Sequence, residues 1–359
     1  MKSKSARLQS MPLTLLVAAA VMAAASSSAI AAEGRGQRYS PGVGGSDMTS
    51  LLVPGWYGQV AIINYHATKL KGNDGKDAAL AGTTATPVGN VPYTAKFDHV
   101  RADVYAALNR ITYLSTTQVF GANLGFTAML PVIKRQNSFD PRVALGVPVS
   151  EPTATGIRNT VSDRIKSQTN DDAFGFGDLE LSPVLHWELG DNQSISFAPT
   201  VVFPTGNYNK AEPVNAGFGN FYTFRPSVQY GYIGDGWDVG ARAVLSFNTR
   251  NKDTDYKSGN MFNLDFQLMK FVTEDVRLGL QGYVVRQISD DSSDNAAAQA
   301  AIDAADGSRM RTYALGPALA WIKNGGEMMI EGKLLREFGS RNRTEGTAYW
   351  LTISKPFGL

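Results

Sequence analysis

Hydrophobic and polar residues alternate strictly along two neighbouring segments in the middle of the chain. In residues 178–204, DLELSPVLHWELGDNQSISFAPTVVFP, apolar side chains occupy every second position on each side of the polar run 190–193. A period of two over such a length predicts a β-strand, and two strands across a short polar turn predict a hairpin. Strands of soluble domains are typically about five or six residues long, whereas a tilted strand needs ~9–11 residues to cross a bilayer. These two segments have the length of membrane-crossing strands.

The same unit recurs along the rest of the chain. An even number of strands is typical of bacterial outer-membrane barrels. The pattern predicts about twelve strands, at residues 56–67, 98–108, 118–132, 179–189, 194–203, 221–233, 237–249, 260–271, 276–287, 309–321, 327–338 and 347–357. Pro183, Pro199, Pro226 and Pro317 lie within these segments, and each removes a ladder hydrogen bond. We expect β-bulges at these prolines.

The connections between the predicted strands alternate between long and short. Residues 68–97 and 133–178 form long connections, whereas residues 190–193, 234–236 and 273–275 form tight turns. Transmembrane barrels have short periplasmic turns and long outer loops, while a sandwich or propeller has no reason to sort its loops in this way. The sequence therefore predicts an all-β fold, a transmembrane antiparallel β-barrel of about twelve strands in residues 56–359.

Two segments precede the predicted barrel. Residues 1–31 combine a basic start, an apolar run at 13–25 and an A-x-A end at 29–31, which is typical of a secretory signal peptide cleaved after Ala31. Such a signal predicts export from the cytoplasm, and together with the predicted barrel it predicts a location in the bacterial outer membrane. Residues 32–55 are rich in glycine and show no periodicity, so they predict a lead-in without strands. This lead-in either enters the barrel as a plug or remains a periplasmic tail.

The last predicted strand runs to the end of the chain. Tyr349, Leu351, Ile353, Phe357 and Leu359 alternate with other residues. This pattern resembles the terminal strand that the barrel-assembly machinery reads. We expect that machinery as a partner during biogenesis and outer-membrane lipid around the finished barrel.

Composition excludes several classes of protein. The chain has no cysteine, which excludes disulfides and thiolate metal sites. It has 34 basic and 32 acidic residues, and loss of Lys2, Lys4 and Arg7 with the signal peptide brings the net charge close to −1. Nothing in this balance indicates nucleic-acid binding. No later apolar run reaches the ~18 residues of a membrane-spanning helix.

Two connections carry acidic runs, and the second of these runs is followed by an alanine-rich run. The acidic residues at 253–255 and 289–294 offer carboxylate ligands but lack the spacing of a calcium loop, so we expect solvated surface and no bound metal or cofactor. Residues 295–305, NAAAQAAIDAA, predict a short helix capped by Asn295.

Polar side chains on the second face of the predicted strands predict a polar lumen. Both signs of charge occur, so we expect salt-bridge networks rather than selection of one charge. These side chains either line a permeation path or bond to one another and fill a narrow lumen. The candidates are Arg101, Asp103, Glu180, Glu188, Arg225, Gln229, Arg242, Asp265, Arg277, Gln281, Glu331 and Lys333.

Catalytic chemistry has little support in the sequence. A serine hydrolase needs a serine, a histidine and an orienting acid or amide within hydrogen-bond reach. The histidines are His66, His99 and His186, and Ser182 is four residues from His186 along one strand, too far for a bond at ~3.3 Å per residue. No HExxH motif occurs. We therefore expect no catalytic residues.

Short motifs also carry a resemblance to a known family over nearly all of the expected mature chain. They are EG at 33–34, YSPG at 39–42, PGWY at 54–57, GFGDL at 175–179, SP at 182–183, FPTGNY at 203–208, NT at 248–249, TDYKSG at 254–259, GY at 282–283, ALGP at 314–317, REFG at 336–339 and NR at 342–343. In this order they resemble the family called putative MetA-pathway of phenol degradation, also labelled SphA-like. The resemblance implies a transporter-like outer-membrane barrel associated with the breakdown of phenol and other aromatic or hydrophobic compounds. It carries over no catalytic or binding residues.

The function expected from these observations is a channel or transporter for uptake of small hydrophobic solutes, phenol-like aromatic ones among them. One alternative is a structural or adhesive barrel that works through the loops at 68–97 and 133–178. A second alternative is a barrel lipid hydrolase, which would depend on His186.

Overall fold

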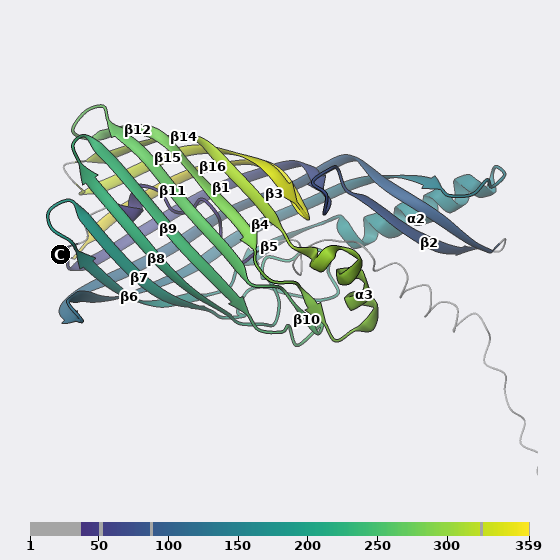
Figure 1. Cartoon of the computed structure of the whole chain (residues 1–359), viewed down its shortest axis with the longest axis horizontal. Helices are drawn as coiled ribbons and strands as arrows, with labels where there is room; N and C mark the ends of the chain where they lie inside the picture. Colours follow the sequence, from purple (N-terminus) through teal and green to yellow (C-terminus); the bar gives the residue numbers. More distant parts are fainter. Residues whose placement is uncertain (1–36, 50–52, 87–88, 324–325, 359) are drawn as a thin grey trace, which may run out of the picture.

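The computed structural model describes residues 37–49, 53–86, 89–323 and 326–358, and it shows a closed β-barrel (Figure 1). The predicted signal peptide, residues 1–31, lies outside the described residues. Each strand of the wall is antiparallel to both neighbours, and β16 pairs with β1 to close the ring. The prediction of a twelve-stranded transmembrane barrel is confirmed. Its strands are β1 (Gly55–Lys71), β3 (Gly89–Val119), β4 (Ala122–Leu145), β6 (Glu180–Glu188), β7 (Gln193–Val202), β8 (Thr223–Gly234), β9 (Trp237–Asn248), β11 (Met261–Phe271), β12 (Val276–Gln287), β14 (Arg311–Lys323), β15 (Met328–Arg341) and β16 (Arg343–Phe357).

The connections are sorted by length between the two ends of the barrel, as the sequence predicts. Residues 120–121, 189–192, 235–236 and 272–275 make short connections at one end, which we call the short-turn end. Residues 203–222, 249–260 and 288–310 make long loops at the other, the long-loop end. The exception at the long-loop end is the connection from β15 to β16, which consists of Asn342 alone. By the usual orientation of such barrels, the short-turn end faces the periplasm.

The bounds predicted for two long loops and for the strands at 98–108 and 118–132 are wrong. Strands β3 and β4 have 31 and 24 residues and extend past the barrel rim. There β2 (Ala79–Thr86) pairs with β3, and β5 (Asp171–Phe176) pairs with β4. The strand predicted from residue 118 starts at Ala122, because Phe120 and Gly121 form the preceding turn with φ angles of 53° and 77°. Glycine and proline beside the alternating residues of 89–97 obscured the extension of β3.

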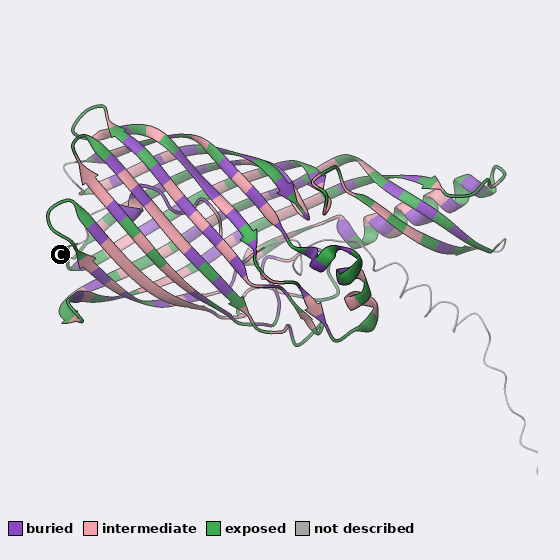
Figure 2. Cartoon of the chain, viewed as in Figure 1, coloured by how far each residue is buried: buried purple, intermediate pink, exposed green. Residues whose placement is uncertain are grey.

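The projecting sheet has a hydrophobic cluster of its own. Helix α2 (Thr153–Thr169) buries Ile157, Val161 and Ile165, whose spacing of four residues places them on one face. This face packs against Val91 and Tyr93 of β3, and the cluster continues to Val143 of β4. Figure 2 shows the buried positions of α2 as a stripe along the helix. The projection is therefore stabilised by packing that does not involve the lumen.

The four strand prolines do not form the bulges that the sequence predicts. Pro183, Pro199 and Pro226 lie opposite one another on β6, β7 and β8, and the strand register is the same on both sides of this row. The register across Pro317 is also unchanged. Near the prolines the described pairing has gaps: residues 182–184 of β6 have no partner on β7, and residues 225–226 of β8 have no partner on β9. The sheet thus loses ladder bonds where the N–H is absent and keeps its register without an inserted residue.

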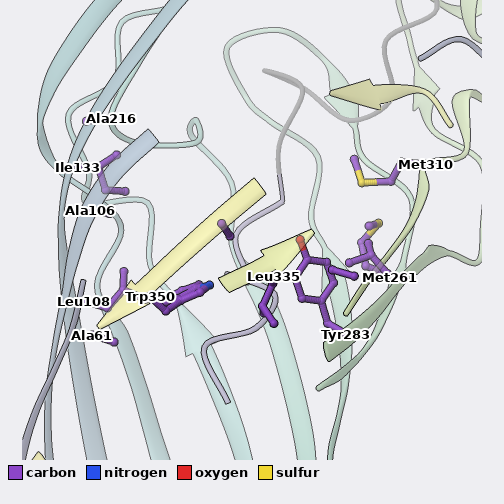
Figure 3. Packing of buried hydrophobic residues seen from close by; sticks show 13 residues of the cluster. Ala61, Ala106, Leu108, Ile133, Ala216, Met261, Tyr283, Met310, Leu335 and Trp350 are labelled. Atoms are coloured by element: carbon purple, nitrogen blue, oxygen red, sulfur yellow. The ribbon is translucent and has the colours of Figure 1, made fainter. Parts of the chain in front are cut away.

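The two faces of the wall meet different surroundings. Outward positions such as Val228, Leu319 and Leu351 are exposed apolar side chains, as expected for a surface that contacts lipid. On the inside, a buried cluster that includes Leu108, Leu335 and other side chains packs within the lumen (Figure 3). The outward residues of the strands therefore form the lipid-facing surface, and some of the inward residues form an apolar cluster inside the barrel.

A smaller element covers the long-loop end. The helix predicted at 295–305 is confirmed as α3 (Ala296–Ala304), and the Asn295 side chain accepts hydrogen bonds from the N–H groups of Ala297 and Ala298. Next to it, β10 (Tyr256–Lys257) pairs with β13 (Ser292–Ser293), which joins two long loops. Neither helix in the described part of the chain is long and apolar enough to span a membrane.

We predict that Gly316→Ala destabilises the barrel and that Gly332→Ala does not. A Cβ at Gly316 of β14 would lie 1.7 Å from the Leu334 carbonyl oxygen of β15, whereas a Cβ at Gly332 has no atom within 4 Å. Overpacking of this kind typically costs about 1–3 kcal/mol. Urea unfolding of the refolded barrel, followed by its mobility shift on a gel, measures the difference. Equal unfolding midpoints for the two variants would contradict the close strand contact at Gly316.

Candidate functional site

Residues 37–49, which we call the N-terminal segment, run lengthwise through the barrel (Figure 1). At the long-loop end, Arg38 Nη2 donates a 3.0 Å hydrogen bond to the Gly219 carbonyl. Toward the short-turn end, the Thr49 hydroxyl accepts a 3.2 Å bond from Gln267 Nε2. Glycine permits the close approach, since a Cβ at Gly45 would lie 2.0 Å from Glu331 Oε1. These thirteen residues lie inside the barrel and not in a periplasmic tail.

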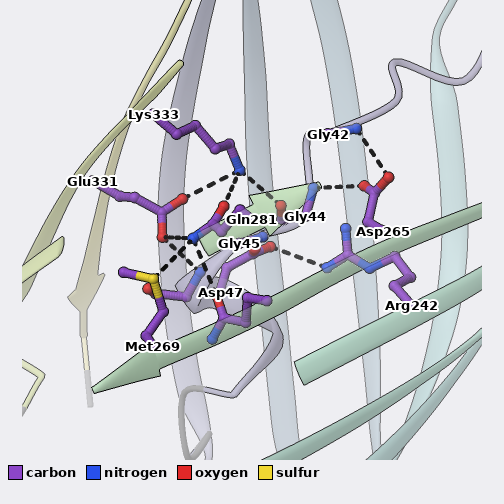
Figure 4. Close-up of polar contacts among 12 residues, drawn as sticks. Gly42, Gly44, Gly45, Asp47, Arg242, Asp265, Met269, Gln281, Glu331 and Lys333 are labelled. Carbon is purple, nitrogen blue, oxygen red and sulfur yellow. Dashed lines mark hydrogen bonds and ion pairs between the residues drawn. The ribbon is translucent and has the colours of Figure 1, made fainter. Parts of the chain in front are cut away.

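Asp265 of β11 anchors the middle of the N-terminal segment. Its buried carboxylate accepts a 2.7 Å hydrogen bond from the Tyr39 hydroxyl. It also accepts bonds of 2.9 Å each from the N–H groups of Gly42 and Gly44 (Figure 4). Gly42 has a φ of 85°, a conformation that favours glycine. Hydrogen bonds to an ionised group are stronger than neutral ones. One side chain of the wall therefore fixes the segment at three points.

A second set of contacts joins the segment to β12 and β15. Lys333 Nζ donates to the Gly44 carbonyl and to Gln281 Oε1, both at 2.7 Å. Glu331 Oε2 accepts 2.8 Å bonds from the Ser46 N–H and from Gln281 Nε2. Lys333 and Glu331 are themselves 3.3 Å apart. Figure 4 shows these side chains converging on the segment from β12 and β15, which β14 separates in the wall. The wall thus offers the segment both a cation and an anion.

Two charged residues of the segment form ion pairs with the wall. Asp47 lies 2.6 Å from Arg110 Nη2 and 3.1 Å from Arg242 Nη2. Burial raises the pKa of Asp47, but the charges of Arg242 and Arg110 outweigh it and hold that pKa well below its ordinary value. Arg38 Nε lies 3.0 Å from Asp178. The N-terminal segment thus carries one acid and one base, and each of them lies within ion-pair distance of an opposite charge outside the segment.

The N-terminal segment lines two cavities in the lumen. The outer cavity, of about 230 Å³, lies toward the long-loop end. The inner cavity, of about 390 Å³, lies toward the short-turn end and is lined by many serine and threonine side chains. Five residues line both cavities: Tyr39, Ser40, Leu108, Met129 and Glu180. The cavities therefore adjoin where Tyr39 and Ser40 of the segment meet the wall.

The structure places ten of the twelve predicted lumen residues on the inward face of the wall. Glu188 lies at the short-turn end of β6, where its carboxylate is 3.3 Å from His186 Nε2. Asp265, Gln281, Glu331 and Lys333 belong to the contacts around the N-terminal segment. The residues that line a cavity are Glu180, Arg225, Gln229, Arg242 and Arg277.

The prediction that Arg101 and Asp103 face the lumen is wrong. On β3 the even positions from Ala102 onward line the cavities, so residues 101 and 103 point outward. Asp103 accepts a 2.6 Å bond from Arg101 Nε and lies 2.5 Å from His66 Nδ1, in a cluster on the outside of the wall. Strand β3 is much longer than the ~9–11 residues that cross a bilayer. Where β3 extends beyond the bilayer, its outward side chains no longer contact lipid. Polar side chains can therefore point outward there, and apolar side chains can point into the lumen.

Several polar residues of the lumen are not among the predicted ones, and Arg110, Arg135 and Gln37 are three of them. Arg110 of β3 and Arg135 of β4 fall outside the strand ranges predicted for them, although both keep the alternation of their strands. Gln37 precedes every recognised strand. Correct strand bounds would have revealed the two arginines, whereas no sequence signal marks Gln37.

A Ser-His-Glu chain also lies on the inward face. His186 Nδ1 is 2.8 Å from Ser196 Oγ across the β6–β7 pair, and His186 Nε2 is 3.3 Å from Glu188. Ser182, the serine that the sequence brings to attention, does not contact His186 in the described hydrogen bonds; its hydroxyl bonds to the Pro183 carbonyl. Ser196 lies in a regular ladder and not at an exposed turn, so its neighbouring N–H groups are engaged in strand pairing. Ser196 and Glu188 thus give the buried His186 side chain a partner for each of its ring nitrogens. Within the described residues there is no cluster of three or more His, Asp or Glu that could hold a metal ion.

The chain matches a protein-family model, and several solved structures are similar to it. A family model described as "Putative MetA-pathway of phenol degradation" matches residues 74–353. The COG4313 outer membrane channel from Pseudomonas putida F1 is similar with a TM-score of 0.64 at 15% identity, covering 88% of this chain and 100% of that one. The P. putida toluene transporter TodX gives a TM-score of 0.38 at 10% identity over 92% of this chain and 99% of its own. The CymD monoaromatic hydrocarbon channel gives 0.39 at 10% identity over 89% and 94%. No curated protein matches the chain in sequence.

We predict that Asp265→Ala loosens the N-terminal segment and raises the conductance of the barrel several-fold. The change leaves Tyr39, Gly42 and Gly44 without their shared acceptor, and hydrogen bonds to charged groups are worth about 1.5–3 kcal/mol each. Single-channel recording in planar bilayers measures the effect. Glu188→Ala is the matched control, because Glu188 is an inward carboxylate whose described bond is to His186 and not to the segment. Unchanged conductance in Asp265→Ala would show that the anchor does not hold the segment in place.

Proposed function

Because the chain belongs to the family described as "Putative MetA-pathway of phenol degradation", we propose that it is an outer-membrane channel for uptake of small hydrophobic solutes, phenol-like aromatic ones among them. The barrel fold and the likeness to an outer membrane channel support the outer-membrane location. Export through a signal peptide cleaved after Ala31 belongs to the same proposal. So does the division of the chain into residues 1–31, a plug within 32–55, and a barrel from 56 to 359.

The observation that carries this proposal is the apolar wall of the outer cavity. Its lining includes Ile63, Val104, Ile133 and Phe139, together with other aliphatic and aromatic side chains. A dry apolar cavity of about 150 Å³ is known to hold benzene, so about 230 Å³ accommodates a single substituted ring. Ligand sites of this kind combine apolar walls with a few polar groups. The outer cavity is therefore the entry site for the solute.

The inner cavity offers the next position along the path. It adjoins the outer cavity at Tyr39 and Ser40, which belong to the N-terminal segment. A solute that moves from one cavity to the other must pass this point of the segment. Passage then requires the segment to shift against its contacts with Asp265, Glu331 and Lys333. The inward charged side chains bond to one another and to the N-terminal segment, and these bonds hold the segment in place. We assign no catalytic role to them.

The projecting sheet favours a second candidate function. Helix α2 and the extended ends of β3 and β4 form a separate packed unit outside the lumen. Such a unit suits a structural or adhesive barrel that contacts another surface. Removal of the protein would then change cell adhesion and leave solute uptake unaltered.

We predict that deletion of the gene slows the initial uptake of labelled phenol or toluene at low concentration and that complementation restores it. Cells with a permeabilised outer membrane serve as the control, because permeabilisation should restore uptake in the deletion strain. Equal uptake by intact deletion and wild-type cells across several aromatics would reject the proposed function. A change in adhesion alone would favour the second candidate.

A further inference from the structure

Among the described residues that line the outer cavity, one cation has no ion-pair partner within 4 Å. Arg135 of β4 lines this cavity, and its guanidinium carbon lies 4.2 Å from the centre of the Phe218 ring. Its buried Nε has no hydrogen-bond partner, and none of the ion pairs among the described residues includes Arg135. The Arg135 side chain is half-buried, so its guanidinium has lost part of its hydration without gaining an ion-pair partner among the described residues, which is costly. A stacked arginine with open N–H groups is suited to bind a planar anion.

The acids of the cavity wall are already committed to other partners. Asp178 pairs with Arg38 at 3.0 Å, and Glu180 pairs with Arg225. Glu337 pairs with Arg343 at 2.8 Å and also accepts bonds from two tyrosine hydroxyls. Arg135 is therefore the one charge on the described lining of this cavity without an ion-pair partner.

A second polar group in the same cavity lacks a partner. Gln37 of the N-terminal segment lines the outer cavity, and both atoms of its buried side-chain amide have no hydrogen-bond partner among the described residues. Leaving a buried amide unpaired costs free energy, which a bound ligand can recover. The cavity thus presents an open guanidinium and an open amide beside apolar side chains that include Ile133 and Phe139.

We propose that the outer cavity binds small aromatic molecules that carry a single carboxylate. Arg135 binds the carboxylate through charge-assisted hydrogen bonds, the Gln37 amide donates a further bond, and the ring packs against the apolar wall. This inference rests on the proposed function, since it names the solute class that the entry site prefers. A neutral hydrocarbon fills the apolar part of the cavity but leaves Arg135 and Gln37 unpaired.

The test is a comparison of benzoate, benzamide and toluene binding to the purified full-length protein in detergent at neutral pH. Isothermal titration calorimetry measures the three affinities for wild type, Arg135→Gln and Arg142→Gln. Arg142 is the matched control, because it lies on the same strand with a side chain 73% exposed and pairs with Asp98. Benzamide has the shape of benzoate without its charge, so the pair isolates the contribution of the anion.

The wild type and Arg142→Gln are expected to bind benzoate about tenfold or more tightly than benzamide, because a hydrogen bond to a charged group contributes at least that ratio. Arg135→Gln is expected to lose this preference and to keep its affinity for benzamide. Equal affinities of the wild type for benzoate and benzamide would overturn the inference, whether or not the variant folds. A benzoate preference that survives Arg135→Gln would overturn it as well. If toluene uptake depends on the protein but the wild type shows no preference for benzoate, this inference is rejected and the proposed function stands. If uptake does not depend on the protein and no benzoate preference is found, both are rejected.

Discussion

The whole structure depends on the closure of one antiparallel ladder. In hydrocarbon, no water is available to backbone N–H and C=O groups, so a spanning sheet must have no free edge. Pairing of β16 with β1 removes that edge. Closure also fixes the alternation of side chains, because every second residue must face lipid and the others must face the lumen. Polar groups on the inner face then need partners, and the N–H groups of the N-terminal segment supply several to Asp265 and Glu331.

The lumen therefore becomes a divided passage instead of an open pore. The N-terminal segment crosses it, and Tyr39 and Ser40 stand where the two cavities adjoin. At the long-loop end the extended β3 places apolar side chains on the inward face, where they line the outer cavity together with paired charged residues. Further along, serine, threonine and paired charged residues line the inner cavity. In the proposed function, the same contacts that satisfy buried polar groups determine how readily a solute passes.

The strand alternation predicts the barrel class, the strand number and the lipid-facing sides, because in a closed spanning sheet alternate side chains must face lipid and the lumen. It places Arg225, Arg242 and Asp265 on the inward face for the same reason. It fails at Arg101 and Asp103, because alternation alone does not show where a strand leaves the bilayer and its apolar face turns inward. It also fails at the strand prolines, because a register can survive missing hydrogen bonds. The course of residues 37–49 depends on tertiary contacts that carry no periodicity.

The most direct test of this account is to tether the N-terminal segment to the wall and measure solute passage. The chain has no cysteine, and a Cβ at Gly240 would lie 3.2 Å from the Met48 Cβ, close to the ~3.5–4.5 Å of a disulfide. In cells carrying Met48→Cys with Gly240→Cys, we expect toluene uptake to fall to the level of deletion cells when the disulfide forms and to recover on reduction. Full uptake with the disulfide intact would show that solutes pass without movement of the segment, and would contradict the account.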